Sequence, residues 1–371
     1  MNQIEVKKSI YIGGEKLKKI LFVEGLSNHV GHKKMNKLFM EIFMKKYEVH
    51  TLCFSDWYFD LSPNIIQHFY IDTKEFWIKK LTRTFSAINI LTEIKKLDKK
   101  LKFDIIIMST FSYWVTPLWP FFFRNYNKMW ILHHDDLDLS RRYPYKIFFY
   151  IFVKRYVHLT LDSFIKKGMM EWYPGISDRI FELIHPHERR VLKEPSLWKE
   201  YQNKFLCISI GRGASDDFFS EIISLEEKKH ILKKNNVYLY LKSSKIKYEN
   251  ENIIVNPNYL SEQEYNELLG RASVLFVCYN NNYHLRVSGQ LLDGISNYKY
   301  VIGNDIQIVR AYEERYPDIC KAIITGEDFL NQLILLKRNN YNEIDFKMFF
   351  KDHSDEKILK QMNQIEKIIF R

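Results

Sequence analysis

The sequence has few cysteines, no long apolar run and no short-period repeat. Its four cysteines lie far apart and form no CxxC pair. Three of them occur in apolar, strand-like runs, so we expect buried free thiols in a reducing cytosol. No stretch reaches the ~18 consecutive apolar residues that a membrane-spanning helix needs, and the N-terminus lacks the apolar core of a signal peptide. These absences predict a cytoplasmic protein with no membrane-spanning helix.

Apolar residues are plentiful enough for a large core. The 371 residues are 46% hydrophobic and include 27 Phe and 24 Tyr. A chain of this length is typical of two domains of ordinary size. Its composition indicates a globular protein rather than a disordered or fibrous one.

Positive charge is concentrated in the first half of the chain. The formal net charge is +11. Residues 1–200 contain 33 Lys and Arg against 22 Asp and Glu, whereas residues 201–371 contain 23 of each kind. A basic face suits an anionic lipid surface, an anionic polymer or a nucleic acid.

Apolar runs alternate with helical patterns in both halves, which is typical of parallel α/β sheets. In the first half a helix is expected over 33–46, and a short helix begins at a cap formed by Asp162 or Ser163. The expected buried strands there are 18–25, 47–54, 103–108, 128–134, 156–161 and 180–186. The polar stretch 187–204 is interpreted as a linker, and the alternation restarts after it. We therefore expect an N-terminal domain over 1–190, a C-terminal domain over 204–350, and a last helix within 351–371.

The stretch 284–305 has the features of a site for an anion that carries a sugar. A helix that opens at Ser288, Gly289 and Gln290 offers free backbone N–H groups and a positive dipole end to a diphosphate. Gly289 permits close approach of the backbone. Arg286 can add a bidentate phosphate contact, and Asp293 lies further along the same helix. The alternative is that Ser288 is a plain helix cap and Asp293 a solvated residue.

This region resembles the matching part of GT-B glycosyltransferases, particularly the large retaining group called family 4. That group has the motif G-Y-x-S-x-x-E-x-x-x-L-Y-x-x-A-D-V, followed by L-E-A-M-A-x-G-x-P-V-I-A-T. The likeness covers most of residues 205–310 and is weaker over the first domain. The matching positions are Tyr259, Ser261, Glu264, Leu268, Ala272 and Val274 for the first motif, and Leu292, Asp293, Tyr298, Val301 and Ile302 for the second.

The resemblance implies a GT-B architecture, in which two Rossmann-like parallel α/β domains face each other across a cleft and the last helix, within 351–371, packs back on the N-terminal domain. It implies a hexosyl- or related glycosyltransferase with a nucleoside-diphosphate sugar as donor and with no metal or other cofactor. The expected acceptor is a hydroxyl of a glycan or lipid-linked glycan in the synthesis of a bacterial surface polysaccharide, such as capsule or lipopolysaccharide. A rival reading is a catalytically inactive GT-B-like protein that only binds.

Further donor contacts follow from the same resemblance. The loop after the strand at 205–209 is similar to the family's phosphate-binding loop, with matches at Gly211 and Arg212. The family's loop also has a Lys that binds the donor diphosphate, and this loop does not match it. Lys242, at the end of another strand, can supply that positive charge. Tyr259 is a further candidate donor contact. One position departs from the family pattern, because Leu285 stands where retaining members have a Glu eight residues before the acidic residue.

Two loops of the first domain carry candidate acceptor and catalytic residues. Residues 24–34 form a polar loop in which Gly31, His29 and His32 are candidate acceptor contacts. His133, His134 and Asp135 end a buried strand and are the candidates for contact with the donor sugar or for the general base. His and Asp also suit a metal ion. Neighbouring residues of one loop rarely converge on one ion, so we expect no metal here.

Aromatic and basic residues alternate in 113–130 and 141–155. Trp, Tyr and Phe beside Lys and Arg suit peripheral contact with an anionic membrane, here the inner face of the cytoplasmic membrane. Core-facing helices with solvated charges are the other interpretation. A nucleic-acid-binding protein is a weaker rival, because charge is its only support, and we expect no nucleic-acid partner.

Overall fold

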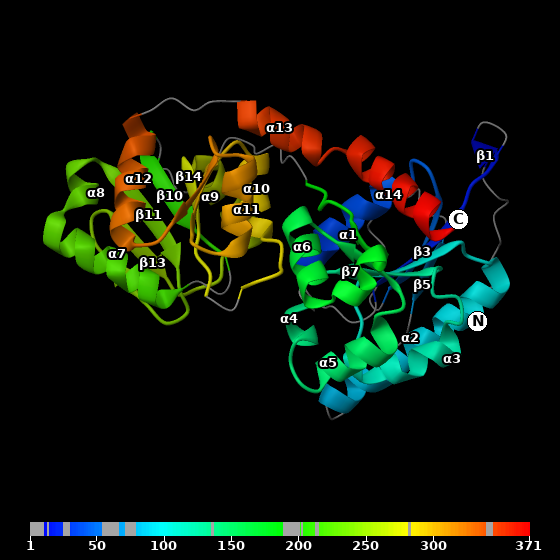
Figure 1. The fold of residues 1–371 in the computed structure, drawn as a ribbon. Coiled ribbons are helices and arrows are strands. Elements are labelled where there is room, and N and C mark those ends of the chain that lie inside the picture. The colour runs from blue at the N-terminus through cyan, green and yellow to red at the C-terminus, as the bar shows by residue number, and fades with distance from the viewer. Residues whose placement is uncertain are drawn as a thin grey trace. The chain divides into compact units, whose positions relative to one another are not determined.

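The computed structural model divides the chain into two compact units. Unit 1 comprises Met1–Pro186 with His353–Arg371, and unit 2 comprises His187–Asp352. The structure describes residues 11–12, 15–24, 30–53, 67–70, 79–134, 137–187, 201, 203–211, 215–280, 283–338 and 344–371. Figure 1 follows the chain by colour, and the two units are described separately below.

Unit 1 is built on a parallel sheet. Its described residues form seven strands in the order β5-β4-β3-β6-β7-β8-β9, and every neighbouring pair is parallel. The central strands are apolar runs buried on both faces, as parallel sheets require. The strands are β3 (Lys19–Glu24), β4 (Glu48–Cys53), β5 (Gln67–Tyr70), β6 (Ile105–Met108), β7 (Met129–His133), β8 (Val157–Thr160) and β9 (Ile180–Glu182), and a separate antiparallel pair is β1 (Tyr11–Ile12) with β2 (Glu15–Lys16).

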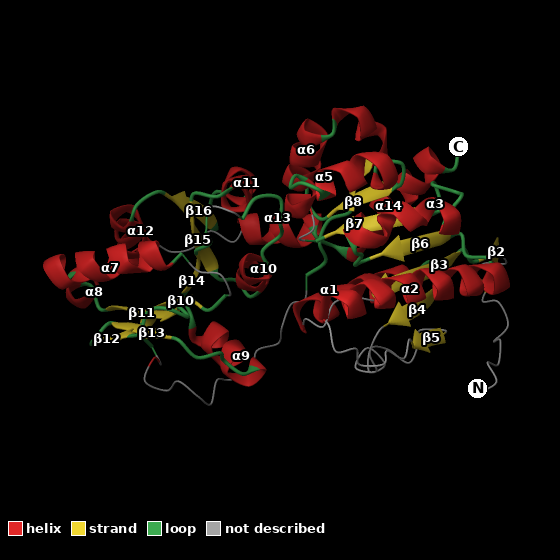
Figure 2. Ribbon diagram, turned by 90° about the horizontal axis from the view of Figure 1, so that it is seen from below, coloured by secondary structure: helices red, strands yellow, loops and turns green. Residues whose placement is uncertain are grey.

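Helices cover the sheet of unit 1 (Figure 2). Asp162 is the cap of α6, because its carboxylate accepts from Phe164 N at 3.2 Å. The helical segments are α1 (Val30–Phe43), α2 (Lys79–Leu101), η2 (Tyr113–Leu118), α3 (Trp119–Phe122), α4 (Leu137–Ser140), α5 (Tyr145–Phe148), η3 (Phe149–Val153), α6 (Ser163–Trp172), η4 (Pro174–Arg179) and α14 (Asp355–Ile369).

The last helix, α14, lies in unit 1 although the whole of unit 2 precedes it (Figure 1). Its Glu366 is bonded to Lys18 and to Tyr47, which lie just before β3 and β4. Gln361 accepts from Ile184 N at 3.0 Å. These contacts join the end of the chain to the starts of β3 and β4 and to the segment that follows β9.

Unit 2 repeats the parallel plan. Its described residues form a sheet in the order β12-β13-β11-β10-β14-β15-β16, in which only the edge strand β12 is antiparallel to its neighbour. The strands are β10 (Phe205–Ser209), β11 (Val237–Lys242), β12 (Tyr248–Glu249), β13 (Ile253–Asn256), β14 (Val274–Val277), β15 (Tyr300–Asn304) and β16 (Cys320–Ile323). The helices are α7 (Asp216–Lys229), α8 (Ile231–Lys234), α9 (Glu262–Arg271), α10 (Gly289–Ser296), α11 (Gln307–Arg315), α12 (Gly326–Arg338) and α13 (Ile344–Asp352).

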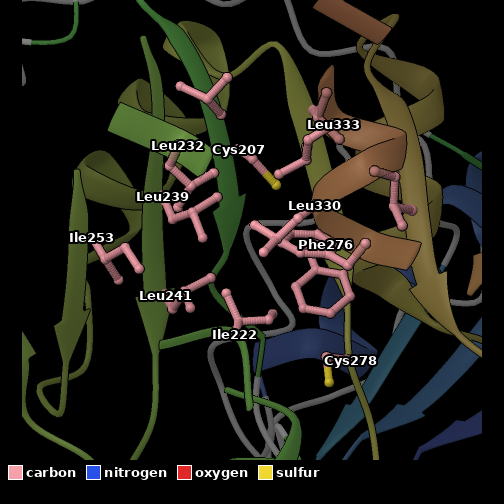
Figure 3. Packing of buried hydrophobic residues seen from close by; sticks show 14 of the residues in the cluster. Cys207, Ile222, Leu232, Leu239, Leu241, Ile253, Phe276, Cys278, Leu330 and Leu333 are labelled. Atoms are coloured by element: carbon pink, nitrogen blue, oxygen red, sulfur yellow. The ribbon is translucent and has the colours of Figure 1, made fainter. Parts of the chain in front are cut away.

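One apolar cluster of unit 2 lies between this sheet and the helices α7 and α12. Phe276 on β14 packs against Phe329, with ring centroids 4.3 Å apart, and Leu330 and Leu333 of α12 join the same cluster. Figure 3 shows Leu330 beside the Phe276 ring and Leu333 beside the thiol of Cys207, with Cys278 on the other side of that ring. The four cysteines are buried free thiols, as the sequence predicts.

Both sheets have one point where the strand order reverses. In unit 1 the chain runs from β3 outward through β4 and β5 and then returns to the other side of β3 with β6. In unit 2 the same reversal separates β10 from β14. Ligands of open parallel sheets bind beyond the carboxyl ends of the strands at such a point. Ligands of the two sheets are therefore expected beside the residues that follow β3 and β6 in unit 1 and β10 and β14 in unit 2.

The prediction of two parallel α/β sheets is confirmed. The first helix begins at Val30, three residues before the expected start at 33, so Gly31 and His32 lie in its first turn and not in a loop. Periodicity gave no expectation for α2, α11, α12 or β16.

Candidate functional site

The start of α10 is capped in the way that the sequence predicts. Ser288 is the N-cap, and its buried hydroxyl accepts from Leu291 N at 3.0 Å. The first N–H groups of a helix have no partner within the helix, and the positive end of its dipole lies there. A Cβ built on Gly289 meets nothing within 4 Å, so the space beside this glycine is open. The helix start can therefore receive an anion at close range.

A second glycine brings the loop after β10 against the same helix. A Cβ built on Gly211 would lie 2.1 Å from Gln290 Oε1, so only glycine fits there without displacing that side chain. Gln290 is itself buried and donates to Phe276 O at 3.2 Å. Gln290 thus bonds α10 to β14 and lies against the loop after β10. Arg212, which follows Gly211 in that loop, lies outside the described residues.

Two residues that sequence reasoning missed support the cap. Tyr279, just after β14, is buried, and its hydroxyl lies 2.8 Å from Ser288 Oγ. Asn304, at the end of β15, holds the backbone of Tyr279 through two hydrogen bonds of 3.0 and 2.7 Å. Burial raises the pKa of Tyr279 to about 12, so the phenol keeps its proton at neutral pH. A Tyr directly after an apolar strand and an Asn at a strand end were the available signals.

Arg286 and Leu285 lie just before the cap. The Arg286 guanidinium is 5.8 Å from the centroid of the Tyr283 ring, and that ring stacks on Tyr279 at 4.2 Å. Arg286 is therefore placed beside the aromatic residues that support the helix start. Leu285 is only 1% exposed. At the position where the family pattern has a Glu, this chain has an apolar side chain that belongs to the core.

Asp293 lies further along α10 and is half-buried. One of its carboxylate oxygens accepts from Tyr265 Oη at 2.9 Å, which connects α10 to α9. Helix α9 itself begins with a capping box formed by Ser261 and Glu264. A carboxylate has several acceptor positions, so Asp293 can also accept from a ligand hydroxyl.

Lys242 and Tyr259 form a pair at the end of β11. Lys242 is buried, and its ammonium lies 3.9 Å from the centroid of the Tyr259 ring. Tyr259 is 69% exposed. The ring therefore covers the lysine, and a cation–π contact holds the two side chains together.

In unit 1, His134 and His133 have different surroundings. His133, the last residue of β7, is fully buried, and its Nε2 lies 2.9 Å from His158 Nδ1. Burial and the neighbouring His133 hold the pKa of His158 well below its ordinary value. His134 is half-buried, and its Nε2 lies 3.0 Å from Ser109 Oγ. Of the two histidines, only His134 is partly exposed.

The remaining candidates of unit 1 are only partly visible. His29 and Asp135 lie outside the described residues. Gly31 and His32 belong to α1, but only their backbone is described.

Among the described residues, no three His, Cys, Asp or Glu side chains gather in a way that would hold a metal ion. None of the helices in the described part of the chain combines the length and the apolar character needed to cross a bilayer.

No family model and no curated protein matches the sequence. Solved structures do match its fold. Sucrose-phosphate synthase from Thermosynechococcus elongatus matches with a TM-score of 0.65 and 10% identity, over 95% of this chain and 99% of that chain. HepE from Anabaena, solved with UDP and glucose, matches with a TM-score of 0.63 and 9% identity, over 94% and 98%. WaaB, a lipopolysaccharide outer core galactosyltransferase, matches with a TM-score of 0.58 and 13% identity, over 94% and 98%.

These matches span nearly the whole chain, and together with the two parallel sheets they establish a GT-B fold. At such low sequence identity the matches show the architecture alone, because one fold supports many chemistries.

Proposed function

We propose that this protein is a glycosyltransferase that moves a sugar from a nucleoside-diphosphate sugar to a hydroxyl of a glycan or lipid-linked glycan. The main support for this proposal is the start of α10, which lies at the strand-order reversal of unit 2. An anion can bind there, because the helix end is capped, the space at Gly289 is open and Arg286 lies just before it. HepE, which shares the fold, was solved with UDP.

Different residues bind the diphosphate and the ribose of the donor. The N–H groups at Gly289 and Gln290, with Arg286, bind the diphosphate, and Asp293 accepts from the ribose hydroxyls. In the reaction, the acceptor oxygen bonds to the anomeric carbon while the bond from that carbon to the diphosphate oxygen breaks. The electron pair leaves on the diphosphate, whose growing charge the same N–H groups and Arg286 stabilise. His134 takes the proton of the acceptor hydroxyl.

Calorimetry with UDP, GDP and CMP tests the donor half. We expect one of the three to bind the wild-type protein and to bind the Arg286→Ala variant more weakly. If none binds, or if Arg286→Ala leaves the affinity unchanged, the donor site is wrong. Because charge stabilisation is assigned to the chain's own residues, transfer should proceed equally in the presence of a chelator. Loss of activity with EDTA that Mg²⁺ restores would contradict the expectation of no metal.

The acceptor is proposed to be lipid-linked and reached at an anionic membrane. Support comes from an exposed surface of unit 1 made by Trp114, Ile147, Tyr150 and Ile151, of which Trp114 is 55% and Ile151 52% exposed. Trp114 packs 5.6 Å from the ring of Phe148 on α5, so η2, α5 and η3 form one patch. The basic residues of the same segments are Arg141, Arg142, Lys146, Lys154 and Arg155. Apolar and aromatic side chains among cations are typical of binding at a membrane interface. Such binding suits a lipid-linked acceptor in the synthesis of a bacterial surface polysaccharide.

Sedimentation with vesicles tests this surface. Wild-type protein should pellet with vesicles that contain anionic lipid and remain in solution with purely zwitterionic ones. A Trp114→Ala/Ile151→Ser variant should lose the binding. Ile324 and Ile344 of unit 2 are also exposed, so Ile324→Ser/Ile344→Ser is the matched control and should bind normally. Equal binding by both variants would refute a role for the patch.

A catalytically inactive binding protein is the second candidate, and buried Leu285 favours it. The family pattern places a Glu there, near the donor sugar, and this chain has nothing polar to substitute at that position. Transfer of a radiolabelled sugar to any acceptor, or release of UDP that depends on acceptor, would exclude this candidate. Nucleotide binding with neither activity would support it.

A further inference from the structure

A buried polar cluster occupies the carboxyl ends of three neighbouring strands in unit 1. Glu24 ends β3 and is 1% exposed, Ser109 follows β6 and is 2% exposed, and His134 follows β7. Asn36 of α1 and Thr110 complete the cluster. It lies where the strand order of unit 1 reverses, which is the expected ligand position of such a sheet.

The donors around Glu24 are well defined. Asn36 Nδ2 and Ser109 Oγ each donate to its Oε2 at 2.9 Å, and Thr110 Oγ1 donates to Oε1 at 2.6 Å. A carboxylate that receives three donors is an acceptor only. The amide of Asn36 is oriented by its bond to Glu24, so its Oδ1 faces Ser109 Oγ at 3.0 Å and is an acceptor as well.

Ser109 therefore faces more acceptors than its one proton can serve. A serine hydroxyl has one proton to donate and lone pairs to receive donors. Glu24 and Asn36 compete for the proton. The third neighbour, His134 Nε2 at 3.0 Å, must then be the donor to Ser109 Oγ. In a neutral imidazole with the proton on Nε2, the lone pair is on Nδ1.

We propose that Glu24 and Ser109 are positioning residues that hold His134 with its proton on Nε2, so that Nδ1 is the basic nitrogen. The role of that nitrogen rests on the proposed function. Nδ1 takes the proton of the acceptor hydroxyl as the new glycosidic bond forms and the diphosphate leaves with its electron pair. The resulting imidazolium carries protons on both nitrogens, and its Nε2–H still points through Ser109 towards the Glu24 carboxylate, which stabilises the positive charge.

Nitrogen NMR of the intact protein, labelled with ¹⁵N-histidine and without donor or acceptor, tests the hydrogen bonding directly. His134→Gln identifies the His134 signals. We expect a one-bond ¹H–¹⁵N correlation for Nε2 and an unprotonated Nδ1. Ser109→Ala should lose the correlation, because the N–H then exchanges with water. Ser140→Ala is the matched control, since that buried hydroxyl donates to Leu137 O at 2.6 Å outside the cluster, and it should keep the correlation.

Three results would overturn the inference: a proton on Nδ1 of wild-type His134, the absence of the Nε2 correlation, or its survival in Ser109→Ala. The first and second do not depend on the folding of Ser109→Ala, because only the assignment variant His134→Gln is needed for them. In transfer assays, Ser109→Ala should lower kcat by about tenfold, the effect of one lost hydrogen bond, with donor KM unchanged. If no transfer is found at all, the proposed function fails while the NMR result stands. Protonated Nδ1 in an active transferase refutes only the positioning.

Discussion

Adding one methyl group at Gly289 should separate nucleotide binding from stability. A Cβ at this position meets nothing within 4 Å, so Gly289→Ala fits the folded protein. Alanine is favoured over glycine in a helix by about 0.5–1 kcal/mol, so the free energy of unfolding should stay constant or rise slightly. The methyl group nevertheless enters the open space in which the diphosphate is proposed to meet the first N–H groups of α10.

The expected loss of affinity follows from one displaced hydrogen bond. A bond from a backbone N–H to a charged phosphate is worth about 1.5–3 kcal/mol, which corresponds to a Kd about 10- to 100-fold weaker. Calorimetry with UDP, or with whichever nucleotide binds, measures this, and thermal unfolding measures stability. Wild-type affinity in Gly289→Ala would refute the placement of the diphosphate at this helix end.

Gly211→Ala is the same chemical change with the opposite expectation. Its Cβ would lie 2.1 Å from Gln290 Oε1, so Gln290 has to move and give up its bond to Phe276 O. Leaving buried polar groups without partners costs about 1–3 kcal/mol of stability. A Gly211→Ala protein as stable as wild type would show that Gln290 does not fasten the helix as described.

Three further results are expected. Arg286→Ala should weaken nucleotide binding by about 10-fold or more, since a charge-assisted bond is lost, and Arg286→Lys should recover only part because lysine binds phosphate as a point charge; calorimetry at two salt concentrations checks both. Tyr279→Phe removes the 2.8 Å contact with Ser288 Oγ and should lower the free energy of unfolding by about 1 kcal/mol in a urea titration, and an unchanged midpoint would contradict it. Burial lowers the pKa of His158 from its ordinary 6.5, so below pH 6.5 the unfolded state binds a proton at this histidine and the folded state does not. Stability should therefore fall below pH 6.5 by up to about 1.4 kcal/mol per pH unit, and His158→Gln, measured by urea unfolding between pH 6.5 and 5, should lose that slope.

Local sequence signals predicted most of the strands and several of the helices. The apolar runs at β3, β6 and β14 can only be buried between two layers of helices, so they predict a parallel sheet without any knowledge of their neighbours. Ser288 and Ser261 cap the helices that follow them because a short hydroxyl side chain satisfies the first N–H groups wherever a helix begins. The amphipathic pattern of α14 likewise predicted a helix, whereas the expectation that it packs on the first domain came from the family resemblance.

The division of roles among neighbouring residues could not be predicted in this way. His133 and His134 are adjacent and chemically identical, yet β7 directs the first into the core against His158 and leaves the second half-buried beside Ser109. The side chain of Gln290, a predicted donor-binding residue, lies beside Gly211 and donates to Phe276 O, which leaves its backbone N–H for the proposed diphosphate contact. Each outcome depends on which side of a strand or helix faces a partner far away in the sequence.

What the sequence by itself determined is the plan: two parallel α/β units, the capped helix with its glycine, and the absence of an acidic residue at position 285. Tertiary structure alone decided which polar groups meet. Glu24 and Ser109 are 85 residues apart and Ser109 and His134 are 25 apart, and only the pairing of β3 with β6 and of β6 with β7 brings their strand ends together. Hydrogen bonds act over about 3 Å, whereas composition and periodicity report only on burial, so a network of this kind is set by strand order and register.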